Sequence, residues 1–240
     1  MKIGVVIPTL DEAQTVERAL RSVVGPGSSD DAVEVIVVDG GSRDETCARA
    51  RKAGARVIET SCSESAPSRR ISGRARQLQA GFEACEGDAV LFLHADTWLP
   101  DGWSRQVRAA LADPGVAGGA FRFRFDPAEG TSPLLRAIEW GARLRVAWFG
   151  LPYGDQAIFA RRSVLEQLGG VPQVALMEDL DLVDGLKRHG RLALLDAPAT
   201  TSARRYRTRG VLRTFGRNAG ALLAWRLGLD RERVAAWYRR

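Results

Sequence analysis

Lysine is scarce in this sequence, and arginine carries almost all of the positive charge. Of the 35 basic residues only Lys2, Lys52 and Lys187 are lysines, and the net charge is +6. Because the arginine guanidinium makes planar, bidentate contacts with phosphate groups, this composition favours an anionic ligand or an anionic surface as a partner. A solvated, arginine-rich surface is the alternative interpretation.

Cysteine and long apolar runs are also scarce. The three cysteines, Cys47, Cys62 and Cys85, have no CxxC spacing, which predicts ordinary thiols in a reducing compartment. No uncharged apolar run approaches the roughly 18 residues that a membrane span needs, and the apolar start of the chain is too short for a signal peptide. We therefore expect a cytoplasmic protein, with peripheral contact to the inner face of the membrane as an open alternative.

The first hundred residues alternate between strand and helix patterns. Largely apolar runs predict strands over residues 3–7, 33–38 and 89–93, and residues 56–59 are a further strand candidate. Apolar residues at helical spacing predict helices over 13–24 and 72–85. This alternation favours an α/β fold in which a mainly parallel sheet is flanked by helices. Ligands of such sheets bind at the carboxyl ends of the strands, where Asp39 and Asp96 both fall.

The second half of the chain has a less regular pattern. It predicts strands over residues 117–125, 156–160, 191–195 and 199–203. It predicts helices over 133–149, 178–188 and 211–227. Two of these helices combine aromatic and apolar stripes with arginines, a pattern that suits a core-facing helix, a homodimer face or contact with an anionic membrane.

Six short segments carry the polar residues of the predicted strand ends and helix starts. They are PTLDE at 8–12, VVDGGSRD at 37–44, GRARQ at 73–77, HAD at 94–96, PYGDQ at 152–156 and MEDLD at 177–181. In this order the segments resemble the family 2 glycosyltransferases, and in particular a bacterial subgroup with GRAxQ, HAD, PYGDQ and MEDLD signatures. The resemblance covers about residues 1–205.

The resemblance implies a GT-A type nucleotide-binding domain and an inverting, metal-dependent transfer of a single sugar. The donor would be a UDP- or GDP-sugar and the acceptor would carry a hydroxyl group. We expect this domain over residues 1–207, with a nucleotide-binding half (1–100) and an acceptor half (101–207). A helical C-terminal extension of amphipathic helices would follow at 208–240. The QxxRW signature of processive synthases is absent, which favours transfer of one sugar.

A divalent cation is expected because the leaving diphosphate carries charge that a Lewis acid offsets. Hard cations such as Mg²⁺ or Mn²⁺ prefer carboxylate oxygens, and Asp96 matches the ligand position of the family. A turn-forming aspartate is the alternative for Asp96. His94 stands where the family more often has an aspartate, and either a metal ligand or a ribose contact remains open for it.

The resemblance implies that the nucleotide lies near the ends of the first two strands. Asp39 matches the acid that accepts a hydrogen bond from the nucleobase, while Gly40 replaces the second aspartate of the usual pair. A turn or helix-cap acid is the alternative for Asp39. The remaining residues expected to bind the nucleotide sugar are Pro8, Thr9, Glu12, Arg74 and Arg205.

Asp179 matches the general base of the family, which takes the proton of the acceptor hydroxyl. A merely acidic helix start is the alternative for this residue. Retention would need a second carboxylate as nucleophile, and Asp181 projects about 200° away from Asp179 on a helix, so inversion is expected. Asp155, Gln156 and Glu178 are expected to bind the acceptor by analogy with the family.

Two other classes of function compete with sugar transfer. A sugar-nucleotide nucleotidyltransferase would need a glycine-rich, basic loop after the first strand, where this chain has the acidic segment 8–12. A non-catalytic, arginine-rich nucleic-acid-binding domain would not place acids at strand ends, because they repel phosphate. Nucleic acid is therefore not expected as a partner. The sequence contains neither a GxGxxG motif nor a P-loop, so neither a dehydrogenase nor a P-loop enzyme is expected.

Overall fold

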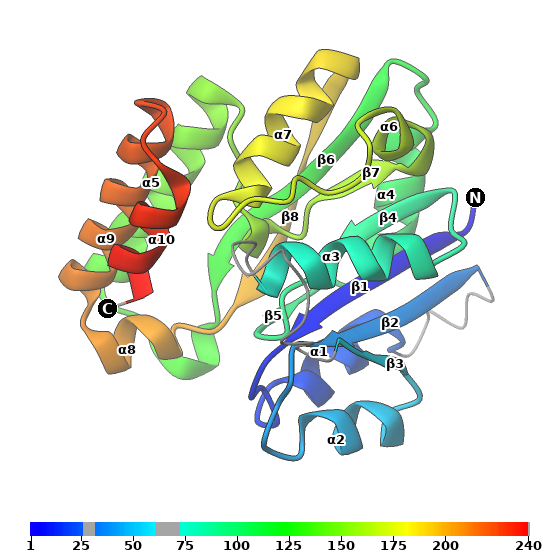
Figure 1. Ribbon diagram of the computed structural model, residues 1–240, viewed down its shortest axis with the longest axis horizontal. Coiled ribbons are helices and arrows are strands. Elements are labelled where there is room, and N and C mark those ends of the chain that lie inside the picture. The colour runs from blue at the N-terminus through cyan, green and yellow to red at the C-terminus, as the bar shows by residue number, and fades with distance from the viewer. Residues whose placement is uncertain (26–31, 61–72, 240) are drawn as a thin grey trace.

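Eight strands in the described part of the chain form one sheet, in the order β3-β2-β1-β4-β7-β6-β8-β5 (Figure 1). The computed structural model describes residues 1–25, 32–60 and 73–239, and Cys62 lies outside them. The strands are β1 (Ile3–Thr9), β2 (Val33–Asp39), β3 (Arg56–Glu59), β4 (Ala89–Phe92), β5 (Thr97–Trp98), β6 (Val116–Phe125), β7 (Phe159–Arg161) and β8 (Arg191–Thr201).

The sheet is mainly parallel, as the sequence predicts. Strands β1, β2, β3, β4, β6 and β8 run in one direction, whereas β5 and β7 run in the other. The carboxyl ends of six strands therefore meet at one edge of the sheet. The loop before the antiparallel strand β7 lies at the same edge, so residues from both halves of the chain come together there.

Helices cover both faces of the sheet, and each face has its own apolar core. The helices are α1 (Val16–Val23), α2 (Thr46–Lys52), α3 (Gly73–Ala84), α4 (Trp103–Leu111), α5 (Pro133–Phe149), α6 (Arg162–Gln167), α7 (Glu178–His189), α8 (Arg204–Arg209), α9 (Val211–Arg226) and α10 (Arg231–Arg239). Helices α1, α2 and α4 contribute to one core, and α3, α6 and α7 contribute to the other. All seven residues of β1 are buried, which explains why this strand reads as an unbroken apolar run.

Three predicted elements differ from the structure. The strand expected over 156–160 begins only at Phe159, because Gly154–Gln156 forms a short 3₁₀ turn and Ala157 has a positive φ of 49°. The strands expected over 191–195 and 199–203 are one strand, β8, whose register against β6 shifts between Leu195 and Pro198. Helices α4, α6 and α8 and the short strand β5 have no counterpart in the prediction.

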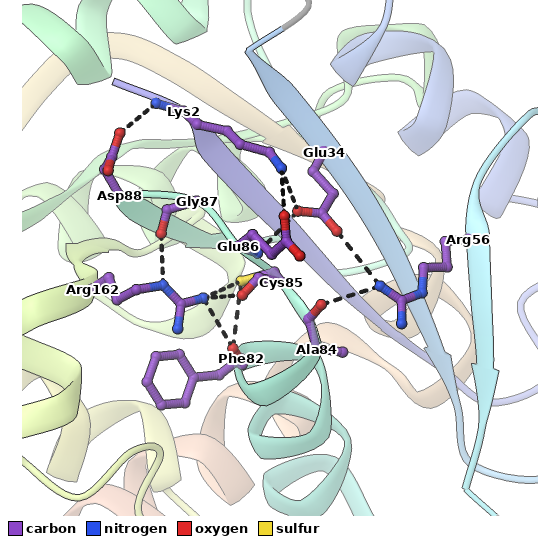
Figure 2. A network of polar contacts seen from close by, with 10 residues as sticks. All are labelled: Lys2, Glu34, Arg56, Phe82, Ala84, Cys85, Glu86, Gly87, Asp88 and Arg162. Carbon is purple, nitrogen blue, oxygen red and sulfur yellow. Dashed lines mark hydrogen bonds and ion pairs between the residues drawn. The ribbon is translucent and has the colours of Figure 1, made fainter.

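The amino ends of the strands are closed by a network of compensated charges (Figure 2). Glu34 lies between the Lys2 ammonium, at 3.3 Å, and the Arg56 guanidinium, at 3.7 Å. Arg162 donates from Nε to the Gly87 carbonyl at 2.7 Å, and the Lys2 backbone N–H donates to Asp88 at 2.7 Å. These contacts join the amino ends of the strands to one another and to α3 and α6, so this edge of the sheet has a structural role.

The C-terminal helices gather beside α5 at one end of the molecule, away from the start of β1 (Figure 1). Asp181 of α7 fastens them: it accepts hydrogen bonds from Trp225 Nε1 at 2.7 Å and from Arg231 Nη2 at 2.9 Å. Ser132 is the N-cap of α5, and its side chain accepts a hydrogen bond from the Leu135 N–H. No helix within the described ranges combines the length and apolar composition that crossing a bilayer requires.

Candidate active site

A cavity of about 300 Å³ opens at the carboxyl edge of the sheet. It is walled by the start of α3, the end of β4, the loop before β7, the start of α7, the end of β8 and the C-terminal helices. Its polar side chains are Arg74, His94, Asp96, Tyr153, Asp155, Glu178, Asp179, Thr201, Ser202, Arg205, Tyr206, Asn218 and Tyr238. Acids and arginines predicted from four separate motifs thus converge on one space.

Asp179 lies in the first turn of α7 and faces the cavity. The backbone N–H of Gly154 donates to its Oδ2 at 2.7 Å, and the Leu180 N–H donates to its Oδ1 at 3.0 Å. Asp181 instead contacts the C-terminal helices. The two acids therefore point to different neighbours, as their helical spacing predicts.

Gly154 holds the peptide that contacts Asp179 close to His94. A Cβ atom at position 154 would lie 2.7 Å from His94 Nε2 and 3.3 Å from Asp179 Oδ2, so only glycine fits this position without displacing a neighbour. Burial lowers the pKa of His94 well below its usual value, and the charges of Arg74 and Arg205 lower it further. The imidazole is consequently neutral.

Glu178 is buried, with 2% of its surface exposed, and forms an ion pair with Arg74. Burial alone would lower the pKa of Arg74, but the carboxylates of Glu178 and Asp179 raise it overall. The pair holds the start of α3 against the start of α7. Both residues still line the cavity, so Arg74 can present its remaining donors to an anion.

Asp96 follows β4 and reaches the cavity from a loop that β8 secures. Its carbonyl accepts from the Ser202 N–H at 2.9 Å and from the Thr201 hydroxyl at 3.2 Å. Burial raises the pKa of the Asp96 carboxyl, Glu12 raises it further, and Arg205 and Arg204 oppose these effects. Arg205 is exposed on α8 and lines the same cavity.

Asp155 lines the cavity, and the hydrogen-bonding capacity of its carboxyl group is not satisfied. Its Oδ1 is buried and has no hydrogen-bond partner in the described chain. Burial raises the pKa of this carboxyl from 3.8 to about 6, while Arg145 acts in the opposite direction. The Oδ1 atom of Asp155 can therefore form a hydrogen bond with a polar group of a ligand.

Gln156, which was expected to bind the acceptor, lies beneath the cavity and is 2% exposed. Its Nε2 donates to the Phe121 carbonyl at 2.9 Å, and its Oε1 accepts from Arg145 at 3.1 Å and from the Tyr153 N–H at 3.2 Å. Its contacts in the described chain therefore support the loop that carries Tyr153 and Asp155.

The residues expected around the nucleobase lie at the same edge of the sheet but outside the cavity wall. Pro8 and Thr9 are buried at the end of β1. Asp39 is 1% exposed and accepts from the Thr9 hydroxyl at 2.9 Å and from the Gly41 and Ser42 N–H groups at 2.9 and 2.7 Å. Burial would raise the pKa of Asp39, but these hydrogen bonds lower it overall.

Glu12 has a structural partner that sequence reasoning missed. Its Oε2 accepts from Arg204 Nη2 at 2.6 Å and from the Thr15 hydroxyl at 3.0 Å. This pair joins the loop after β1 to α8, and so brings Arg205 to the cavity. Glu12 and Arg204 are 192 positions apart in the sequence, so no local sequence pattern predicts their contact.

The structure explains why Gly40 replaces an aspartate. Gln77, buried within α3, donates from Nε2 to the carbonyls of Thr9 at 2.7 Å and Val38 at 2.8 Å. A Cβ atom at position 40 would lie 3.0 Å from that Nε2. The glutamine of the GRARQ segment and the glycine after Asp39 are therefore closely packed, and a side chain at position 40 would require the Gln77 amide to shift slightly.

The side chains of this site can hold a divalent cation only if a bound ligand supplies further oxygen atoms. Among the residues that the structure describes, no three His, Cys, Asp or Glu side chains come together as a metal cage. Asp96 nevertheless offers a hard carboxylate at the cavity wall. Magnesium sites commonly use one or two carboxylates with phosphate oxygens and water, so Asp96 fits a cation shared with a diphosphate.

Sequence comparison identifies the family. The family model described as "Glycosyl transferase family 2" matches residues 4–169, so the chain belongs to glycosyl transferase family 2, a family of sugar-transferring enzymes. The match includes Asp39, Asp96 and Asp155 and ends before Asp179. It favours sugar transfer over nucleotidyl transfer and over nucleic-acid binding.

Among curated proteins, the chain is 28% identical over 191 residues to the probable glycosyltransferase YdaM of Bacillus subtilis, covering 75% of this chain and 45% of that protein. It is 36% identical over 99 residues to the glucosyl-3-phosphoglycerate synthase of Mycobacterium tuberculosis, covering 41% and 30%. The chain spans about a third to about a half of the length of the curated relatives it matches.

Solved structures show the same fold. The crystal structure of the M. tuberculosis glucosyl-3-phosphoglycerate synthase with Mn²⁺, UDP and glucosyl-3-phosphoglycerate matches with a TM-score of 0.64 and 25% identity, covering 95% of this chain and 81% of that chain. A mannosyltransferase of Pyrobaculum calidifontis with GDP-mannose and Mn²⁺ matches with a TM-score of 0.62 and 21% identity, covering 83% and 56%. These likenesses confirm the GT-A type fold predicted from the sequence.

Proposed function

We propose that this chain transfers a single sugar from a UDP- or GDP-sugar to a hydroxyl acceptor, with inversion at the anomeric carbon. The observation that carries the proposal is the convergence of Asp96 and Asp179 on one cavity that Arg74 and Arg205 also line. The relatives whose structures hold UDP or GDP-mannose support a nucleotide-diphosphate donor.

The donor diphosphate lies between the arginines and Asp96 in this proposal. Arg74 and Arg205 offer planar donors to the phosphate oxygens. A Mg²⁺ or Mn²⁺ ion held by Asp96 supplies Lewis-acid stabilisation of the charge on the diphosphate when it is bound. The neutral His94 contributes no charge, and its ring is available to hydrogen-bond the donor. Asp39, with Pro8, Thr9 and Glu12, forms the floor on which we place the nucleoside.

Asp179 takes the proton of the acceptor hydroxyl as its oxygen attacks the anomeric carbon. The Gly154 and Leu180 N–H groups fix the orientation of this carboxylate, and general-base catalysis of this kind contributes about 10²–10⁴-fold. Asp181 is engaged by Trp225 and Arg231, and Glu178 is paired with Arg74. Neither carboxylate beside Asp179 in the first turn of α7 is therefore free to act as the nucleophile of a retaining mechanism.

Nucleotide-dependent thermal stabilisation tests the donor site. UDP or GDP with Mn²⁺ at about 100 times its dissociation constant should stabilise the fold by about 2.7 kcal/mol, which raises the Tm by about 5–10 °C for a chain of this size. The corresponding nucleoside monophosphate and Mn²⁺ alone are the controls, and both should give smaller shifts.

Variants of two aspartates assign the metal contribution. Asp96→Asn should remove the part of the nucleotide shift that depends on Mn²⁺. Asp184→Asn is the matched control, because Asp184 is a partly exposed acid of the same helix, does not line the cavity and pairs only weakly with Lys187 at 3.7 Å. The proposal is wrong if neither nucleotide raises the Tm, or if Mn²⁺ changes nothing in the unaltered protein.

A further inference from the structure

An apolar groove of about 480 Å³ runs between α5 and α9 and joins the polar cavity. Tyr153, Asp155, Tyr206 and Asn218 line both spaces. A molecule bound at Asp155 can therefore extend into the groove without crossing the protein. The volume falls within the range of small-molecule sites in proteins.

Large apolar side chains form much of the groove wall, which Arg145 and Arg226 also line. Ile138, Leu144 and Trp148 come from α5, and Phe215, Leu222 and Leu223 come from α9. Trp148 is 72% exposed, Leu223 58% and Phe215 53%. A contiguous exposed apolar surface of this kind marks an interaction site, because scattered single residues would carry no such meaning.

The shape of the groove favours a long, narrow occupant. Its lining on α5 extends from Ile138 to Phe149, which corresponds to about 17 Å along the helix axis. The lining on α9, from Phe215 to Arg226, has the same length. A single aromatic ring would fill only part of this length, whereas an extended hydrocarbon chain would follow it.

The junction of the two spaces supplies polar groups for the head of such a molecule. Asp155 has an unpartnered, buried Oδ1 there. Burial raises the pKa of Tyr206 to about 12, so its hydroxyl keeps its proton. That hydroxyl accepts from Asn218 Nδ2 at 3.3 Å and can donate to a ligand. The polar end of the groove thus recognises a hydroxyl-bearing head, and the rest recognises a chain.

We propose that the groove holds the hydrocarbon chain of an amphipathic alcohol whose hydroxyl-bearing head lies at Asp155 in the polar cavity. This inference rests on the proposed function, since it names the class of acceptor for the same site. A second copy of this chain is the competing occupant. The continuity of the groove with the polar cavity favours the acceptor, because a protein surface that covered the groove would not reach the reacting groups.

Two exposed glycines within helices provide a matched pair of variants. Gly141 of α5 lines the groove, whereas Gly216 of α9 does not. A Cβ atom at either position would meet nothing within 4 Å, so both positions are open to the start of a side chain, and leucine is a better helix former than glycine. Gly141→Leu places an isobutyl group in the groove, and Gly216→Leu places one on the outer surface.

The test measures binding of decyl maltoside below its micelle concentration, by titration calorimetry, with maltose as the chain-free control. We expect saturable one-to-one binding of decyl maltoside and none of maltose. Gly141→Leu should weaken decyl maltoside binding about tenfold or more, because the leucine displaces buried methylene groups. Gly216→Leu should leave it unchanged. Equal affinity in the Gly141→Leu protein, or equal weakening in both variants, would overturn the inference.

Two further readouts separate the possible failures. Sedimentation identifies the competing occupant: a dimer that Gly141→Leu converts to monomer, without decyl maltoside binding, makes the groove a protein interface and overturns the inference. Stabilisation by UDP or GDP with Mn²⁺ is measured on all three proteins. Nucleotide binding without decyl maltoside binding refutes only the groove, whereas the reverse result refutes the proposed donor site.

Discussion

Replacing Asp155 with asparagine should stabilise the protein at neutral pH, even though the residue lies in the proposed active site. Burial raises the pKa of Asp155 from 3.8 to about 6. One pKa unit corresponds to about 1.4 kcal/mol, so the charged carboxylate costs the folded state up to about 3 kcal/mol above pH 6. Asparagine has a similar shape and carries no charge, and it should recover most of that cost.

The pH dependence gives the sign of this effect. Between about pH 4 and pH 6 the unfolded chain has lost the proton of Asp155 while the folded chain retains it, so the free energy of unfolding falls as the pH rises. The Asp155→Asn protein lacks this term. The two proteins should therefore be equally stable near pH 4 and diverge up to pH 6, with a constant difference above it.

Calorimetric unfolding without nucleotide or metal measures the difference. For a chain of this size about 3 kcal/mol corresponds to a Tm increase of up to about 6–12 °C. Asp184→Asn, which removes a partly exposed carboxylate of α7, is the control and should not alter the Tm in this way. An Asp155→Asn protein that is no more stable than the unaltered chain at about pH 8, or whose advantage is larger near pH 4, would refute the reasoning.

Substitutions at three further positions test the site and its supports. Asp179→Asn should leave the nucleotide-dependent Tm shift intact and reduce sugar transfer about 10²–10⁴-fold; turnover at the normal rate in a transfer assay would remove Asp179 as the base. Gln77→Ala and Gln77→Glu should each lower the free energy of unfolding by about 1–3 kcal/mol, because neither side chain can donate to the two carbonyls that Gln77 joins. Urea denaturation measures the free energy of unfolding. A Gln77→Glu protein as stable as the unaltered protein would show that the donated hydrogen bonds are unimportant. Arg231→Ala should lower the Tm and speed proteolysis within α10 by breaking the contact with Asp181, whereas the exposed Arg233→Ala should do neither.

The central sheet could be predicted because its signals are local. The apolar runs at 3–7 and 89–93 are strands that are buried along their length, and the strand predicted at 33–38 is buried from Ile36 onward, so consecutive apolar residues indicate these strands. The strand expected over 156–160 failed because the positive φ of Ala157 ends a turn there, and an alanine gives no sign of this conformation. The two strands predicted around Pro198 are one, because β6 accommodates the irregularity through a register shift that only pairing reveals.

The site was predictable where its residues belong to motifs at strand ends. Asp96, Asp155 and Asp179 were placed in one site from the sequence, and the structure brings all three to one cavity. Asn218 and Tyr238 were not foreseen as wall residues, since their positions depend on how α9 and α10 dock. The structural partners of Glu12 and Gln156 were missed for the same reason: a carboxylate or an amide in a motif can serve the ligand or the scaffold, and contacts across the chain decide which.

The contacts of α9 and α10 with Asp181 limit how far the chain can be shortened from its C-terminal side without altering the cavity. A chain shortened after β8 would keep the whole sheet and all six signature segments, yet it would lose Asn218 and Tyr238 from the cavity wall. It would also leave Asp181 without the donors of Trp225 and Arg231, two residues along the helix from Asp179. A domain boundary placed directly after the last motif would therefore remove residues that form part of the cavity wall.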